Sequence, residues 1–152
     1  MVHEREPATL VEFLAPYPET VRELTLDSRM LLLDLLYPTN EIFYDAISAV
    51  CSGFVYTEKV RDSFVNLAVY SDHVTLIFQY GVNLTDPESR LKGSGNQVRH
   101  IRLTGLETLQ DPYVVDLIRQ SSENATRPTE PMKPVQIVKE MNGPKRRPKA
   151  QV

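Results

Sequence analysis

Cations and glycines gather in one short stretch of the chain, where their chemistry suits an anion site. The residues concerned are Lys92, Gly93, Gly95, Arg99, His100 and Arg102. The Gly-Ser-Gly turn lets backbone amides point toward one place, and the neighbouring cations can hold a phosphate or carboxylate there. Gly95 is expected to adopt a positive φ angle. The spacing is not that of a phosphate-binding loop, and no helix follows directly. We therefore expect either a small-anion site or a tight loop closure whose arginines pair with acids.

Strand alternation limits how many of these cations can meet. The residues after the turn read as a strand, in which successive side chains point to opposite faces. Arg99 then points to one face, whereas His100 and Arg102 point to the other. The guanidinium of Arg99 suits a bidentate contact with a carboxylate or phosphate. Its expected partner is an acid of the preceding loop, Asp86 or Glu88, or an external anion.

Acidic and phenolic side chains form a second candidate patch. It comprises Tyr44, Asp45, Glu58 and Asp62, with Glu41 and Tyr56 near them in sequence. Oxygen ligands of this kind suit hard cations or iron. No carboxylate and histidine stand at a ligand spacing, because the three histidines are far apart in the sequence. The metal is therefore unknown, and a solvated acidic surface is the alternative interpretation.

The sequence indicates no catalytic residue. Cys51 lies in an apolar run, which favours buried packing over a role as nucleophile. His73 begins a buried-looking strand and is interpreted as structural. No Ser/His/Asp or Cys/His arrangement has local support, although triads can assemble from distant positions. An enzyme therefore has no positive evidence, and no cofactor is expected apart from iron under the metal-binding alternative.

Capping signals and apolar spacing predict three helices. Thr9 and Glu12 form a capping box before a short first helix. Pro18 suits the start of a longer helix, which apolar residues at helical spacing continue to about Leu36. Asp111 is a good cap for a third helix near the C-terminal end of the domain.

Between these helices the sequence predicts a meander of strands. Short runs rich in β-branched and aromatic residues cover residues 46–57, 63–70, 73–80 and 97–103, and acids and aromatics before them form a connection. A loop of about sixteen residues precedes the last strand and is expected to be functional or self-packed. The fold class is α+β, with an antiparallel sheet of about four to five strands packed against N-terminal and C-terminal helices.

Charge and proline content divide the chain. With 152 residues and 41 % apolar composition, the chain supports one domain with a real core. Residues 1–8 are expected to be flexible, residues 9–125 to form the domain, and residues 126–152 to be a disordered, Pro-rich tail. The tail has seven basic and two acidic residues, a net charge of +5, and the rest carries −8. A body this acidic makes nucleic acid an unlikely partner, outside the basic tail.

The sequence predicts a cytoplasmic protein without a membrane partner. No run approaches the roughly 20 apolar residues of a membrane span. The N-terminal residues include acids where a signal peptide needs a basic and then an apolar region. The single cysteine cannot form an internal disulfide, which fits a reducing compartment.

Two groups of residues at fixed spacing resemble the YdhG-like family of small bacterial domains, most of them of unknown function. The first group is Gly81, Leu84, Asp86, Pro87, Leu91, Gly93, Gly95, Arg99, His100, Ile101 and Arg102. The second is Tyr44, Asp45, Gly53, Phe54, Thr57, Glu58, Asp62, Phe64 and Ala68. The resemblance covers roughly residues 10–125. The chain departs from it at Ile47 and Ser48, where relatives often carry a Tyr-Asn pair. One member is known as a frataxin-like iron chaperone, so the resemblance implies iron handling as an alternative function.

The function expected from the sequence is a non-enzymatic binding domain for a small anionic ligand or a protein partner. The ligand-site residues are those of the stretch that ends at Arg102, with the acidic patch as the second candidate. The alternative is a frataxin-like protein that binds iron and passes it on.

Overall fold

Two helices open the described structure. The computed structural model describes residues 3–141 of the chain. Helix α1 spans Ala8–Leu14 and helix α2 spans Glu19–Leu36, so both predicted N-terminal helices are present. The predicted capping box is wrong, because Thr9 lies inside α1 and Pro7 precedes it without any side-chain cap.

The segment before α1 packs on α2. Arg5 forms ion pairs with Glu23 and Asp27, the latter with 2.9 Å between Nε and Oδ1. Pro7 is buried. Residues 1–8 are predicted to be flexible, and the first two of them lie outside the described residues.

Six strands form one sheet in the order β5-β4-β3-β2-β1-β6. They are β1 (Asn40–Asp45), β2 (Val50–Val55), β3 (Val65–Val69), β4 (Val74–Phe78), β5 (Arg99–Arg102) and β6 (Gln136–Glu140). Strands β1 to β5 pair antiparallel with their neighbours, as a meander does, whereas β6 runs parallel to β1. The predicted α+β class is confirmed, with six strands in place of the expected four or five.

The first strand lies where the sequence predicts a connection. Residues 40–45 form β1, and the strand expected from residue 46 begins only at Val50. Ile42 and Phe43 are both buried although they point to opposite faces of the sheet. The segment therefore lacks the alternation of apolar and polar residues by which a half-buried strand is recognised.

The last strand corrects the predicted tail. The sequence predicts disorder from residue 126, whereas residues 136–140 pair with β1 along its free edge. Val135 anchors the start of this strand, because its N–H donates to Oδ1 of Asn40 at 2.9 Å. Prolines occupy the crossover before it, where no backbone pairing is needed. Residues 142–152, with most of the basic charge, lie outside the described residues.

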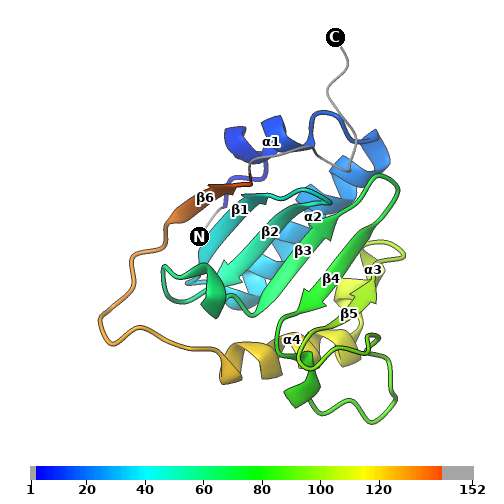
Figure 1. The fold of residues 1–152 in the computed structure, drawn as a ribbon, viewed down its shortest axis with the longest axis vertical. Helices are drawn as coiled ribbons and strands as arrows, with labels where there is room; N and C mark the ends of the chain where they lie inside the picture. The colour runs from blue at the N-terminus through cyan, green and yellow to red at the C-terminus, as the bar shows by residue number, and fades with distance from the viewer. Residues whose placement is uncertain (1–2, 142–152) are drawn as a thin grey trace.

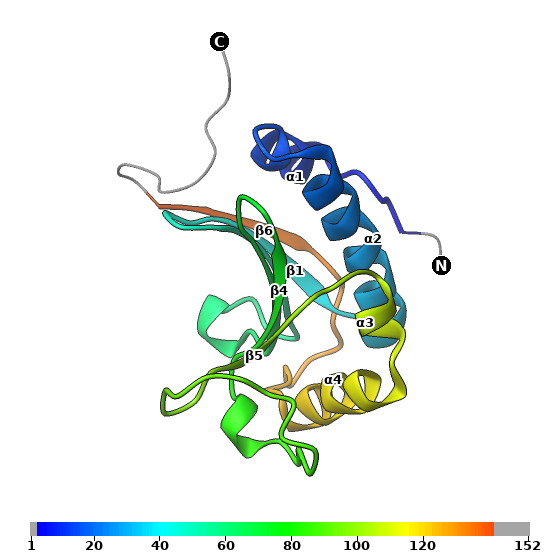
Figure 2. The ribbon, with the colours of Figure 1, turned by 90° about the vertical axis from the view of Figure 1, so that its right-hand side faces the viewer.

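The helices cover one face of the sheet. Figure 1 shows the strands in front of α2, and Figure 2 shows α2 and α4 along one side of the sheet. The C-terminal helices are α3 (Glu107–Gln110) and α4 (Pro112–Asn124). Oδ1 of Asp111 accepts from the N–H of Tyr113 at 2.9 Å, which confirms the predicted cap. Two short 3-10 turns, η1 (Val60–Asp62) and η2 (Gly81–Asn83), belong to the β2–β3 hairpin and the loop after β4.

Apolar side chains between the sheet and these helices form the core. Residues with no more than 1 % exposure come from both layers: Leu32, Val65, Leu67, Leu76, Leu117 and Ile118. Full burial of one such side chain contributes about 1.5–3 kcal/mol. This layer fixes which face of the sheet the helices cover.

One ion pair is buried in the same layer. Arg29 of α2 is 1 % exposed, and Glu41 of β1 is 4 % exposed. Nε of Arg29 donates to Oε2 of Glu41 at 2.6 Å, and Nη2 donates to Oε1 at 2.7 Å. Nη1 donates to the backbone oxygen of Glu4, and the guanidinium lies 5.7 Å from the ring centroid of Phe43. The bidentate pair ties α2 to β1 at a fixed position.

We expect Arg29→Met to lower the free energy of unfolding by about 3–5 kcal/mol, because it leaves the carboxylate of Glu41 buried without its partner. Adding Glu41→Leu should recover much of that loss, since the buried charge is then removed as well. Urea titration measures both. Arg5→Met is the control, because its partly exposed ion pairs are worth about 1 kcal/mol or less. A loss for Arg29→Met no larger than that of the control would contradict the prediction.

Candidate functional site

The second face of the sheet has no α-helix over it in the described part of the chain (Figure 2). We call this surface the open face. Strand register assigns to it the residues Ile42, Tyr44, Cys51, Gly53, Asn66, Ala68, Thr75, Ile77, His100 and Arg102. An antiparallel sheet normally presents polar side chains on a solvated face. Much of this face is apolar or aromatic instead.

A groove of about 390 Å³ lies on the open face. Ile42, Tyr44, Cys51 and Ile77 line it from the strands, and Arg61 lines it from η1. The groove therefore combines an apolar floor with a cation beside it.

Three of the six residues predicted to bind an anion lie at one edge of the open face. We call Lys92, His100 and Arg102 the cationic edge. Lys92 and His100 exchange two backbone hydrogen bonds of 2.9 Å, which puts Lys92 in register beside β5. Arg102 pairs with Thr75, next to the β3–β4 turn. The hydrogen bond from His73 is the main cause that holds the pKa of Asp72 below its usual range, and the charges of His73 and then of Arg102 lower it further.

Arg99 points away from the open face and has a structural role. Its Nη1 donates to the backbone oxygens of Gly95 at 2.7 Å and Val98 at 2.8 Å. Its stem packs over Gly81, where an added Cβ would lie 2.4 Å from Cβ of Arg99. The predicted ion pair with Asp86 or Glu88 is wrong, because Arg99 binds the carbonyl groups of the turn instead.

Gly93, rather than Gly95, has the glycine-specific backbone. Gly93 has a φ of +127°, and an added Cβ would lie 3.1 Å from the oxygen of Val98. Gly95 has no positive φ, and an added Cβ would meet nothing within 4 Å. The predicted positive φ of Gly95 is therefore wrong. The chain turns at Gly93 because the next strand must pair directly with Lys92.

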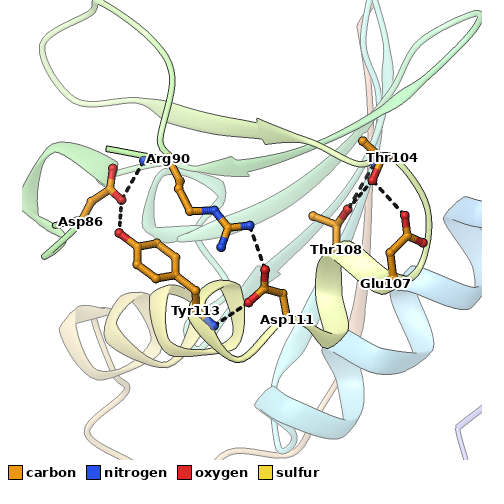
Figure 3. A network of polar contacts seen from close by, with 7 residues as sticks. All are labelled: Asp86, Arg90, Thr104, Glu107, Thr108, Asp111 and Tyr113. Atoms are coloured by element: carbon orange, nitrogen blue, oxygen red, sulfur yellow. Dashed lines mark hydrogen bonds and ion pairs between the residues drawn. The ribbon is translucent and has the colours of Figure 1, made fainter. Parts of the chain in front are cut away.

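The long loop is held by Asp86 (Figure 3). Its Oδ1 accepts from the hydroxyl of Tyr113 and from the N–H of Arg90, and its Oδ2 accepts from the N–H of Leu91 at 2.9 Å. Burial raises the pKa of Asp86, but the hydrogen bonds from Tyr113 and the two amides outweigh it, so this pKa lies below its usual range. The loop is thus self-packed, as one of the two sequence expectations has it.

Arg90 provides the second contact between the loop and α4. Its Nη2 donates to Oδ2 of Asp111 at 2.8 Å, and its guanidinium lies 4.8 Å from the ring centroid of Tyr113 (Figure 3). Asp111 therefore caps α4 and binds the loop at once. Sequence reasoning found Asp86 as a possible partner of Arg99 and Asp111 as a cap, but it missed the Tyr113–Asp86 and Arg90–Asp111 contacts, because each joins residues more than twenty positions apart.

The residues of the acidic patch do not come together. Tyr44 lines the groove, whereas Asp62 lines a separate cavity beside α4 and Glu58 lines a third one near Pro131. Asp45 is the last residue of β1, and its backbone oxygen accepts a hydrogen bond from the N–H of Met141 at 2.9 Å. Within residues 3–141, no group of three or more His, Cys, Asp or Glu side chains is placed to hold a metal ion.

Cys51 lies on the floor of the groove. Burial raises the pKa of its thiol to about 11, so the thiol is protonated at neutral pH. A thiol in this state packs as a small apolar side chain and is a poor nucleophile. Burial, and after it the neighbouring Cys51, also raises the pKa of Tyr70.

Comparison with models of protein families, with curated protein sequences and with solved structures finds no match. In the part of the chain that the structure describes, no helix has both the length and the apolar character needed to cross a bilayer.

Removing the hydroxyl of Tyr113 should make stability less dependent on acid pH. Because the pKa of Asp86 is lowered in the folded protein, its contribution is present above the unfolded value of about 4 and is lost as the pH falls through the folded value. We therefore expect Tyr113→Phe to destabilise the protein at neutral pH and to lose its effect below pH 4. Urea titrations across this range measure the change.

Tyr80→Phe is the matched control, because the hydroxyl of Tyr80 donates to the backbone oxygen of Arg61 and to no carboxylate. The change that Tyr80→Phe causes in the free energy of unfolding should stay constant over the same pH range. Identical pH profiles for the two variants would show that Tyr113 does not act through Asp86.

Alkylation of Cys51 should be slow and should accelerate with pH. As the chain has one cysteine, the iodoacetamide rate reports this thiol alone. We expect a rate at pH 8 more than about tenfold below that of N-acetylcysteine, rising about tenfold per pH unit until pH 10. If the alkylation rate reached a plateau near pH 9, as the rate of a free thiol does, the result would contradict the raised pKa.

Proposed function

We propose that the protein is a binding domain without enzymatic activity, and that its open face takes an acidic segment of a protein partner. The observation that carries this proposal is the groove on the uncovered sheet face, with its apolar floor and the cationic edge of the same face. Uncovered apolar grooves of this kind are common sites of protein interaction.

The charge distribution supports an acidic partner. Exposed acids lie on the helices, at Glu19, Glu23, Asp34, Asp116 and Glu123, and one, Asp72, lies in the turn near Arg102. The open face instead carries the cationic edge, with Arg61 beside the groove. Complementary potentials of this kind steer an acidic partner to one face and repel it from the other.

The shape of the groove favours a peptide segment over a small anion. Its lining residues come from four neighbouring strands, from Ile42 of β1 to Ile77 of β4. A small anion would contact the cationic edge and leave that floor unused. An extended peptide directs alternate side chains to one side. It can therefore place apolar side chains on the floor and acidic ones near the cations.

The proposal includes membership of the YdhG-like family of small bacterial domains, which rests on the motif residues alone. Two of these, Asp86 and Gly93, shape the loop that carries Lys92 to the cationic edge. The proposal also includes a cytoplasmic location, for which the argument is the single cysteine, typical of a reducing compartment.

Fluorescence anisotropy with a labelled peptide of alternating glutamate and leucine tests this function. We expect the peptide to bind, and the double variant His100→Gln/Arg102→Gln to weaken binding by about tenfold. Raising the salt concentration should also weaken it, since the cationic edge is exposed. Arg119→Gln is the matched control, because it removes a cation from the helical side and should leave affinity unchanged.

Three results would count against the proposal. Equal affinity for a lysine-leucine peptide, measured alongside, would remove the role of charge. Inorganic phosphate that binds at the cationic edge while the peptide does not would identify a small-anion site. Calorimetry could instead show that the native chain binds ferrous iron and that the double variant Asp45→Asn/Asp62→Asn does not. This result would support the iron-handling alternative.

A further inference from the structure

A second cavity lies on the other side of the β2–β3 hairpin, next to α4. It has a volume of about 240 Å³. Its walls come from the hairpin (Asp62, Phe64), from the start of the long loop (Tyr80, Asn83) and from the end of α4 (Asn124, Ala125). Three segments distant in sequence thus enclose one small space, and none of the groups in the proposed peptide groove lines it.

The electrostatic character of this cavity is negative. Asp62 forms no ion pair with any described residue, and its Oδ2 accepts one hydrogen bond, from the hydroxyl of Thr57 at 2.8 Å. Helix α4 ends at Asn124 beside the same cavity, and Arg127 offsets part of the negative charge of its C-terminus by donating to the backbone oxygen of Ser122. The carboxylate of Asp62 is therefore the feature that favours a cation.

The basic residues nearest in sequence to these walls turn elsewhere. Arg61 lines the groove on the open face. Arg127 lies 4.1 Å from the ring centroid of Tyr56, donates to the backbone oxygen of Ser122 at 2.9 Å, and lines a different cavity. No positive side chain of the described residues lines the cavity beside Asp62.

The remaining walls supply apolar surface and hydrogen-bonding groups. Phe64 is 2 % exposed and Tyr80 is 40 % exposed, and aromatic rings beside a carboxylate suit an alkylammonium group. The side-chain amides of Asn83 and Asn124 make no hydrogen bond with other described residues. These amides are available to orient a polar substituent of a ligand.

We propose that this cavity binds a small molecule with a protonated amine on an apolar body. The ammonium group pairs with the carboxylate of Asp62 near the end of α4, and the apolar body lies against Phe64 and Tyr80. The volume is just below the usual range for drug-sized ligands, which limits the ligand to a small one.

A chemical-shift titration of the whole chain with 2-phenylethylamine tests the proposal. We expect a dissociation constant on the order of 1 mM, with shifts at the backbone amides of Tyr80, Asn83 and Asn124. The neutral isostere 2-phenylethanol should bind about tenfold more weakly or not at all, because it cannot pair with Asp62.

Asp62→Asn should weaken amine binding by about tenfold and leave the weak binding of the alcohol unchanged. Asparagine keeps an oxygen that can accept from Thr57, so the hairpin retains this contact. Glu58→Gln is the matched control, because it removes a carboxylate from the same hairpin but from another cavity.

Equal affinity for amine and alcohol in the native chain would overturn the proposal, and this comparison needs no variant to fold. Shifts scattered away from the cavity, an absence of amine binding, or full binding by Asp62→Asn would overturn it too. The test does not involve the peptide groove, so its outcome is independent of the function proposed above.

Discussion

A single sheet has two faces, and the helices of this chain are placed to cover only one of them. Burial of that face against α2 and α4 supplies the apolar core, and the bidentate pair of Arg29 and Glu41 fixes α2 against β1 within it. The other face consequently keeps its apolar residues, Ile42 and Ile77 among them, without an α-helix above them in the described structure, and the short η1 turn lines the groove beside them. The groove is thus a direct consequence of one-sided packing.

The loop after β4 decides which cations reach the open face. Asp86 and Arg90 fasten the loop to α4, and Arg99 closes its far end through backbone oxygens. These side chains therefore make their contacts within the loop or with α4. Lys92, in contrast, is brought into register with His100 and points with it to the open face. The self-packing of the loop and the position of the cationic edge are therefore two results of the same contacts.

The sequence predicted the elements whose signals are local. The apolar spacing of α2, the Asp111 cap and the meander of β2 to β4 are all confirmed. It missed β1, because burial on both faces hides its alternation, and β6, because four exposed residues and one half-buried residue in a Pro-rich segment give only a short apolar signal. The alternation of side chains along a strand correctly predicted that Arg99 and His100 point to opposite faces of the sheet. It could not show that Arg99 binds carbonyl groups or that Asp86 meets Tyr113, since these contacts depend on tertiary packing over long sequence separations.

The β2–β3 hairpin separates two chemically opposite sites. Arg61 lines the groove, and its neighbour Asp62 lines the cavity beside α4, so adjacent residues of η1 present opposite charges to the two spaces. Tyr80 connects them, because it lines the cavity while its hydroxyl donates to the backbone oxygen of Arg61 at 2.9 Å. The hydrogen bond of Tyr80 therefore joins one wall of the cavity to one wall of the groove.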